Sequence, residues 1–242
     1  MEVITLEKVE STNSYGKMNI DNLSDKSVIR AKEQTSGRGR LNRSWVDLGD
    51  GNLFLSITLK PSDSFNEIYP NLTQYLSVVL CKVLEKYGVE PQIKWPNDVL
   101  INSKKIAGIL SETVFEGQKL KGIVLGIGIN LNASEKDVLS IPDKLVTALN
   151  LELDKDINPD KFLEELLEEF FTNYDEFLVK GFPMIKDYYL DKNCFLSQEI
   201  NVQVFNDKKT GLAKSVNDSG ELVLQTNENK ELILTIGDIL WT

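Results

Sequence analysis

Residues 98–130 read DVLINSKKIAGILSETVFEGQKLKGIVLGIGIN, three apolar runs separated by two short turns. Asn102-Ser103-Lys104 separates the first run from the second, and Glu116-Gly117 separates the second from the third. Apolar runs rich in β-branched residues and bounded by polar or glycine-containing turns predict strands joined as hairpins. The stretch therefore predicts a meandering sheet with helices on it, an α+β pattern rather than strict alternation of strands and helices.

Outside this stretch, one further strand and two helices are predicted. Residues 53–59, LFLSITL, form a β-rich run between turn-forming residues. Residues 70–87 place their leucines and valines on one helical face, and Gly88 suits the left-handed position that ends a helix. Residues 160–180 have an apolar stripe at i, i+4 spacing behind the capping residue Asn158. The predicted fold is thus a mixed β-sheet flanked by helices.

The end of the chain has a different pattern. Four or five short strands with tight turns and no helix follow residue 192, which is typical of a small β-barrel. Two domains are therefore predicted, a large one over residues 1–192 and the barrel over residues 193–242.

The 242 residues have a net charge of −10 and include no histidine. The absence of histidine excludes Ser-His-Asp and Cys-His triads, histidine-ligated zinc and an imidazole base. The negative charge argues against a DNA-binding protein, which needs a basic face. Cys81 and Cys194 fit no paired spacing and are predicted to be reduced thiols. With no signal peptide and no long apolar segment, the protein is expected in the cytoplasm, without a membrane partner.

Residues 34–45, QTSGRGRLNRSW, are the most informative segment for function. Three arginines interleaved with glycines do not suit a buried core. A loop of this composition can close its guanidinium and backbone N–H groups over a polyanion such as a triphosphate, and Trp45 offers a stacking face. A surface loop with chance basic residues is the plainer alternative. The sequence contains neither GxGxxG nor GxxxxGK[ST], so Rossmann and P-loop sites are disfavoured.

Three other segments suggest polar ligand contacts. Residues 94–98, KWPND, place Asp98 between two lysines, the second being Lys105. This arrangement suits Mg²⁺ or phosphate, although a turn-forming role for Asp98 is equally open. Residues 11–13, STN, suit a helix N-cap and also a small polar ligand. Residues 126–132, GIGINLN, form a strand whose glycines permit close approach of a ligand or another backbone.

These segments, in this order, resemble the biotin–protein ligases (biotin–[acetyl-CoA-carboxylase] ligases). The shared signature covers nearly the whole chain and comprises STN, QxxGRGRxxRxW, GNLFLS, KWPND, KxAGILxE and GIGINxN. The resemblance implies a mixed sheet flanked by helices, of the class II aminoacyl-tRNA synthetase-like catalytic fold, with a small SH3-like C-terminal β-barrel. It also implies the monofunctional type without an N-terminal DNA-binding domain, since only ten residues precede Ser11.

The same resemblance implies an ATP-dependent ligase that makes biotinyl-5′-AMP and transfers biotin to a lysine of a biotin carboxyl carrier protein domain. Biotin and ATP with Mg²⁺ would be its substrates, with Asp98 as the metal ligand. The implied catalytic residues are Lys105, Arg38 and Asp98. The implied biotin contacts are Ser11, Thr12, Asn13, Gln34, Gly37, Arg38, Gly39, Arg40, Lys105 and Gly108. The implied nucleotide contacts are Arg40, Arg43, Trp45, Lys94, Asn97, Asn130 and Asn132.

One position departs from the pattern of that family. Leu41-Asn42 stand where its members usually have Arg-Gly, and Asn42 is expected to take the left-handed conformation of the turn. A lipoate or octanoate ligase remains an alternative, although its pattern includes a glycine triplet and a histidine that this chain lacks. A non-catalytic biotin-binding or carrier-docking module is the other, and both a monomer and a homodimer remain open.

Overall fold

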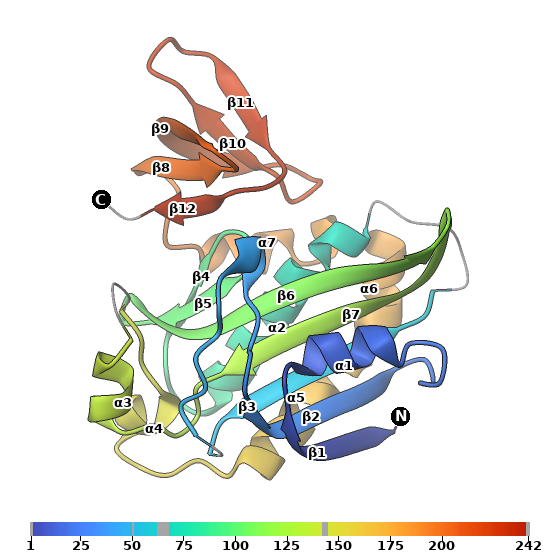
Figure 1. The fold of residues 1–242 in the computed structure, drawn as a ribbon. Coiled ribbons are helices and arrows are strands. Elements are labelled where there is room, and N and C mark those ends of the chain that lie inside the picture. The colour runs from blue at the N-terminus through green and yellow to red at the C-terminus, as the bar shows by residue number, and fades with distance from the viewer. Residues whose placement is uncertain (1, 50, 62–67, 142–144, 241–242) are drawn as a thin grey trace.

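The computed structural model describes residues 2–49, 51–61, 68–141 and 145–240, which form two β-sheets and several helices (Figure 1). The larger sheet has seven strands in the order β1-β2-β3-β7-β6-β5-β4. Strands β1 and β2 are parallel and the other neighbours are antiparallel. Its strands are β1 (Val3–Val9), β2 (Ser27–Gln34), β3 (Leu53–Leu59), β4 (Pro91–Lys94), β5 (Asp98–Ile101), β6 (Lys104–Glu116) and β7 (Lys119–Ile129).

The meander predicted over residues 98–130 is confirmed as β5, β6 and β7. Asn102 and Ser103 both have positive φ, 50° and 62°, in the two-residue turn between β5 and β6. Such a turn matches the twist of an antiparallel pair. Gly117, with φ of 60°, turns β6 into β7. The predicted strand over residues 53–59 is confirmed as β3, the neighbour of β7.

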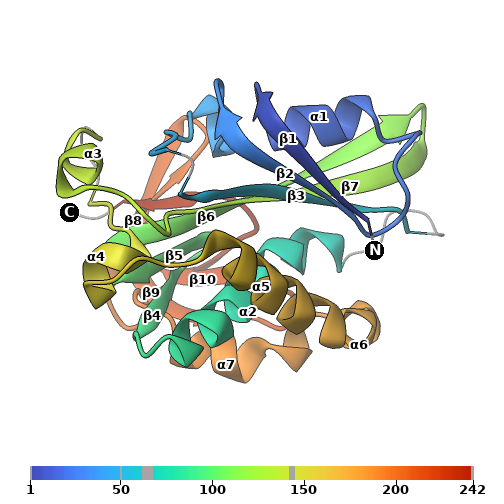
Figure 2. The same ribbon diagram turned by 90° about the horizontal axis from the view of Figure 1, so that it is seen from below.

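Helices lie on both faces of the larger sheet. Figure 2 shows α2, α5, α6 and α7 on one face and α1 on the other. The α-helices are α1 (Thr12–Met18), α2 (Leu72–Lys86), α3 (Glu135–Leu139), α4 (Leu149–Leu153), α5 (Pro159–Thr172), α6 (Tyr174–Lys180) and α7 (Lys186–Asp191). Short 3₁₀ turns are η1 (Arg40–Asn42), η2 (Tyr69–Asn71) and η3 (Phe182–Met184). None of the helices within the described ranges is long and apolar enough to span a bilayer.

The two predicted helices cover one face of the larger sheet (Figure 2), and the second of them differs from the prediction. The first is confirmed as η2 and α2, ended by Gly88 with φ of 86°. The second is capped by Asn158, whose side chain accepts from the backbone N–H groups of the first turn. It is two helices rather than one, because Asn173 leaves the helical region (φ −117°, ψ 6°) after Thr172. Both residues have weak helix propensity.

An aromatic cluster fills the core between these helices and the sheet. The Tyr75 ring of α2 stacks on Phe177 of α6 at 4.4 Å between centroids, and its hydroxyl donates to the Phe170 carbonyl at 2.6 Å. All three side chains are buried. Since the covered face holds this core, the opposite face of the sheet is where polar residues can gather.

The second sheet is antiparallel and contains the predicted C-terminal strands. Its order is β11-β10-β9-β8-β12. The carbonyl of Gly220, in the turn between β9 and β10, accepts hydrogen bonds from Gln74 Nε2 (2.7 Å) and Trp95 Nε1 (3.1 Å), which join this sheet to α2 and to the KWPND segment. The domain boundary at residue 192 stays a prediction. The strands are β8 (Glu199–Val204), β9 (Asp207–Val216), β10 (Leu222–Gln225), β11 (Glu231–Leu234) and β12 (Asp238–Leu240).

Candidate functional site

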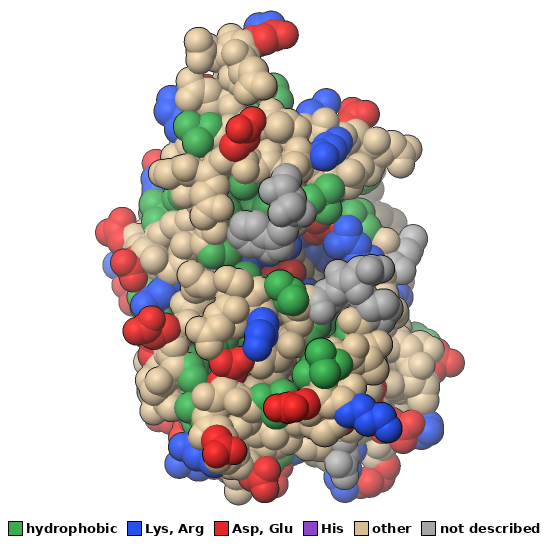
Figure 3. All heavy atoms as spheres, turned by 90° about the vertical axis from the view of Figure 1, so that its left-hand side faces the viewer, with side chains coloured by type: hydrophobic (Ala, Val, Ile, Leu, Met, Phe, Trp, Pro, Cys, Tyr) green, Lys and Arg blue, Asp and Glu red, His purple; other side chains and the backbone are tan. Residues whose placement is uncertain are grey.

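A cavity of about 530 Å³ brings the predicted segments together. Seen from the side, the surface is hollowed beneath the C-terminal sheet, and Lys and Arg side chains border the hollow (Figure 3). The volume is in the usual range for a small-molecule site. The predicted site residues that line it are Ser11, Thr12, Asn13, Gln34, Arg38, Gly39, Arg40, Arg43, Trp45, Lys94, Asn97, Asp98, Lys105, Gly108 and Asn130.

Two predicted residues, Gly37 and Asn132, do not line the cavity. The Gly37 carbonyl accepts from Trp45 N at 2.9 Å, and a Cβ at Gly37 would come within 2.6 Å of the Trp45 carbonyl oxygen. Gly37 therefore permits the close return of the arginine loop. Asn132 donates to the carbonyls of Gly51 and Ile157, and it supports the local backbone. Their predicted roles in ligand contact stay predictions.

The floor of the cavity consists of glycines on neighbouring strands. Gly108 of β6 is paired with Gly128 of β7, and Gly126 lies two residues before Gly128 on the same face. A Cβ at Gly126 would lie 2.0 Å from Asn13 Oδ1, and one at Gly128 would lie 2.5 Å from the Trp45 ring. These glycines are required because other side chains occupy the space that a Cβ would need.

Uncharged hydrogen-bonding groups form what we call the neutral end of the cavity: the buried Ser11, Thr12 and Asn13 and the half-buried Gln34, backed by the buried Ser56. The Thr12 N–H donates to Gln34 Oε1 at 2.8 Å. The Ser56 hydroxyl lies 2.8 Å from Thr12 Oγ1 and 2.6 Å from Asn13 Oδ1. Ser11 caps α1 by accepting from the Ser14 N–H, so the predicted N-cap is confirmed. The sequence reasoning missed Ser56, although a lone serine within the apolar run of β3 is a visible signal.

Glu112 of β6 connects the neutral end to the arginine loop. Its carboxylate accepts from Asn13 Nδ2 at 2.9 Å and from Lys17 Nζ at 2.6 Å, and it lies 3.4 Å from Arg38 Nη2. Burial disfavours the charged carboxylate, but the hydrogen bonds from Lys17 and Asn13 and the positive charges of Lys17 and Arg38 together outweigh burial. The pKa of Glu112 is consequently lower than its ordinary value of 4.5.

We expect Glu112→Gln to lower the free energy of unfolding by about 1–3 kcal/mol at pH 7, because charged partners lose a hydrogen-bonded carboxylate. A carboxylate whose pKa is lowered by folding stabilises the fold at pH values above its ordinary pKa, and this stabilisation is lost on acidification. The difference in unfolding free energy between Glu112→Gln and wild type should therefore shrink as the pH falls below 4.5. Urea unfolding across pH measures it. Glu116→Gln, at an exposed site of the same strand, is the control, and a pH-independent difference would contradict the prediction.

Two lysines and two arginines form the cationic end of the cavity: Arg40, Arg43, Lys94 and Lys105, with Asp98 and Asp238 among them. Lys105 Nζ donates to Asp98 Oδ1 at 2.6 Å. Burial lowers the pKa of Lys94, while the nearby Asp98 carboxylate opposes this effect. Positive charge in this partly dry position suits an anionic ligand.

The arginine loop is ordered by backbone hydrogen bonds. Gly39 N donates to the Arg43 carbonyl at 2.7 Å, and η1 lies between them. The sequence predicted a left-handed conformation at Asn42, and this prediction was wrong. The left-handed residue is Leu41 (φ 52°, ψ 41°). The turn persists although a branched side chain is unfavourable in that conformation. Surrounding contacts must therefore stabilise it.

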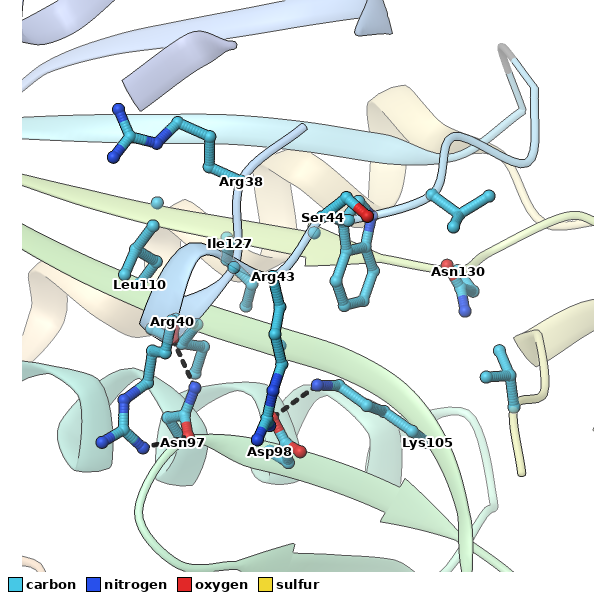
Figure 4. A pocket seen from close by; sticks show the side chains of 18 of the residues that line it. Arg38, Arg40, Arg43, Ser44, Asn97, Asp98, Lys105, Leu110, Ile127 and Asn130 are labelled. Carbon is cyan, nitrogen blue, oxygen red and sulfur yellow. Dashed lines mark hydrogen bonds and ion pairs between the residues drawn. The ribbon is translucent and has the colours of Figure 1, made fainter. Parts of the chain in front are cut away.

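The loop arginines extend in two directions (Figure 4). Arg40 and Arg43 extend toward Asn97 and Asp98, whereas Arg38 extends the other way. Arg40 Nη1 lies 3.1 Å from Asn97 Oδ1 and 3.1 Å from Asp238 Oδ1. Arg43 Nη2 lies 3.0 Å from Asp238 Oδ2. Asp238 was not among the predicted residues, and nothing in the local sequence distinguishes it from other carboxylates of the C-terminal strands.

Trp45 lies over the glycine floor, beside Lys105 of the cationic end. Its ring packs over Gly108 and Gly128, and Lys105 Nζ is 5.4 Å from the ring centroid. Its Nε1 is buried and has no hydrogen-bond partner within the described part of the chain. The ring therefore offers an aromatic face to a ligand, while Nε1 faces the backbone of Gly128, where a Cβ would lie 2.6 Å from it.

Comparison with known proteins places this chain in a family. Residues 5–130 match the profile of the biotin/lipoate A/B protein ligase family. The chain belongs to this family. Among solved structures, this chain is similar to the biotin protein ligase from Aquifex aeolicus in complex with biotin and ATP. The match covers 100% of this chain and 99% of the Aquifex aeolicus chain, with 29% sequence identity and a TM-score of 0.84. The predicted fold class is thereby confirmed.

Two curated relatives of this ligase-family member differ in length. The bifunctional ligase/repressor BirA of Bacillus subtilis is 31% identical over 86% of this chain, and the match spans 64% of that protein. The biotin–[acetyl-CoA-carboxylase] ligase of Paracoccus denitrificans is 28% identical over 94% of this chain and 96% of its own length. The chain thus spans about 64% of the length of the first relative and nearly all of the second.

Proposed function

We propose that the protein activates biotin with ATP to give biotinyl-5′-AMP and pyrophosphate, and then transfers the biotinyl group to a lysine of a biotin carboxyl carrier protein domain. The main support is one cavity that joins the neutral end to the cationic end across a glycine floor. Asp98 pairs with Gly108, and Asn13 contacts Leu110 and Glu112. The ends are thus two to four residues apart along β6, or about 7–13 Å. This spacing suits a carboxylic acid whose polar head and carboxylate are separated by a methylene chain.

The hydrogen bonds of the neutral end indicate how it would hold the biotin ureido group. Asn13 Nδ2 already donates to Leu110 O at 3.2 Å and to Glu112 at 2.9 Å. Its Oδ1 accepts from Ser56 and retains a second lone pair. Asn13 is therefore proposed to accept from a ureido N–H. Ser11, Thr12 and Gln34 line the same end and supply further donors and acceptors.

In the first half-reaction, the biotin carboxylate attacks the α-phosphorus of ATP and pyrophosphate leaves. Two anions must approach each other, so the protein's main tasks are to orient them and to neutralise their charge. Lys105 is proposed to bridge the carboxylate and the α-phosphate. Arg40, Arg43 and Lys94 are proposed to bind the remaining phosphates, with Arg38 closing over the intermediate and Trp45 and Asn130 beside the adenine.

In the second half-reaction, the uncharged ε-amine of the carrier lysine attacks the carbonyl carbon of the mixed anhydride, and AMP leaves. The amine must lose a proton. Asp98, 2.6 Å from Lys105 Nζ, is proposed as the group that accepts this proton or orients the amine.

Mg²⁺ is proposed to arrive with ATP, as part of the substrate. Within the described residues, no group of three or more carboxylate or thiol side chains is placed to hold a metal ion. This fits a cation held mainly by phosphates and water, to which Asp98 adds one carboxylate. The proposed location is the cytoplasm, where ATP is available and where Cys81 and Cys194, both free, would stay reduced.

The exchange of labelled pyrophosphate into ATP tests the first half-reaction. We expect exchange that depends on biotin and is absent with lipoate or octanoate. A biotin carboxyl carrier protein domain should then gain one biotinyl group by mass spectrometry, and its Lys→Arg variant should gain none. Lipoate-dependent exchange would reassign the substrate. Biotin binding without exchange would indicate a non-catalytic module.

A further inference from the structure

Asp238 is a mostly buried residue of the second sheet whose carboxylate contacts the arginine loop. It begins β12, lines the cavity, and its side chain is 13% exposed. Arg40 and Arg43 both pair with it, at 3.1 and 3.0 Å, and Arg40 also donates to the Gly237 carbonyl at 3.1 Å. One position of the second sheet thus binds both ends of η1.

The charges around Arg40 explain why this contact matters when no ligand is bound. Burial lowers the pKa of Arg40 and the nearby positive charge of Arg43 lowers it further, whereas the Asp238 and Asp98 carboxylates oppose this effect. The Arg40 side chain is only 17% exposed, so water compensates its charge poorly. Leu41, between the two arginines, has an unfavourable left-handed backbone. The turn therefore needs a fixed anion when no phosphate is bound.

We propose that Asp238 is a positioning residue: its carboxylate, on the second sheet, holds the Arg40–Arg43 turn over the cavity in the ligand-free protein. This rests on the proposed function only in that the arginines held in this way would meet the phosphates of ATP. Arg38 is not part of this contact with Asp238, since it pairs with Glu112 on the larger sheet. The second sheet thereby contributes to the site through a side chain that need not touch the substrate.

Trypsin digestion of the ligand-free, full-length chain tests directly whether Asp238 stabilises the Arg40–Arg43 turn. Proteolysis requires local opening of a segment. Asp238→Asn keeps the shape of the side chain and removes its charge, so we expect cleavage after Arg40 and Arg43 to become about tenfold faster, which corresponds to about 1.4 kcal/mol of local stability. Mass spectrometry identifies the cuts. Asp207→Asn, at an exposed carboxylate of the same sheet paired only with Lys209 at 3.4 Å in the described structure, should cleave like wild type.

Steady-state kinetics separates positioning from general stability. In Asp238→Asn, the KM for ATP should rise by about tenfold, with kcat changed by less than about threefold and the KM for biotin unchanged. Asp238→Glu should recover part of the loss. Wild-type cleavage rates in folded Asp238→Asn would overturn the proposal. If Asp238→Asn is cleaved faster but the wild-type protein shows no activity with biotin, the positioning role of Asp238 is supported and only the proposed function is refuted.

A second variant decides the matter if Asp238→Asn does not fold. Arg43 is half exposed, so Arg43→Gln should fold while removing one of the two ion pairs. Cleavage after Arg40 should rise relative to wild type and to Lys209→Gln, the matched exposed control. Equal cleavage in Arg43→Gln and Lys209→Gln would overturn the proposal.

Discussion

Lys105→Ala should reduce biotin-dependent pyrophosphate exchange by about 10²–10³-fold, the usual cost of removing one charge-stabilising group from a reaction centre. The ammonium group lies inside the cavity, 2.6 Å from Asp98 and over the ring of Trp45. Without it, no other side chain is proposed to neutralise the carboxylate and the α-phosphate together. Quenched-flow or isotope exchange assays measure the loss.

The backbone hydrogen bonds of Lys105 do not depend on its side chain, so the substitution tests the side chain alone. Lys105 N donates to the Leu145 carbonyl and Thr147 N donates to the Lys105 carbonyl, so truncating the side chain leaves these main-chain bonds in place. The fold should therefore persist, with the melting temperature lowered only by the loss of the ion pair with Asp98. Lys104→Ala, at the exposed neighbouring position, is the matched control and should retain exchange. Near-normal exchange in Lys105→Ala would remove Lys105 from the proposed mechanism.

Gly126→Ala should weaken biotin binding by about 100-fold, or about 2.7 kcal/mol. The added Cβ would lie 2.0 Å from Asn13 Oδ1, far inside contact distance. Asn13 has no room to withdraw, because its side chain is buried and bonded to Ser56, Leu110 and Glu112. The substitution must therefore displace the residue that is proposed to accept from the ureido group.

Titration calorimetry with biotin measures this effect. Gly16→Ala in α1 is a suitable control, because the atom nearest to its Cβ would be Val124 Cγ1 at 3.0 Å, which has to shift by only a few tenths of an ångström, and alanine favours a helix. Its affinity should stay within about threefold of wild type. Unchanged affinity in a folded Gly126→Ala protein would show that Asn13 does not contact the ligand.

Local patterns predicted the elements that their own residues specify. The turn residues of 102–104 and 116–117 predicted the hairpins, because left-handed positions suit only a few residue types. The capping residue Asn158 and the apolar stripe behind it predicted α5. The motifs shared with the biotin–protein ligases identified the segments that line the cavity. Such signals work because they depend on neighbours in the chain.

Contacts between distant segments were not visible in the same way. The parallel pair of β1 and β2 forms the sheet edge from short segments with many charged residues, and no expectation covered it. Asp238 is separated from Arg40 by 198 positions, and no local pattern links the two. The left-handed conformation fell on Leu41 rather than on Asn42, since the hydrogen bonds and ion pairs of the whole loop outweigh the preference of one residue.

The glycine floor limits how the substrate range of this site can be changed. Gly108, Gly126 and Gly128 already present backbone without side chains to the cavity. No substitution at these positions can therefore enlarge the cavity, and every substitution there makes it shallower. A protein engineer who wants to admit a bulkier carboxylic acid must alter the walls, where Thr12, Gln34 and Leu110 still have atoms to lose. The same asymmetry leaves natural variation only two options at the floor: keep the glycines or narrow the site.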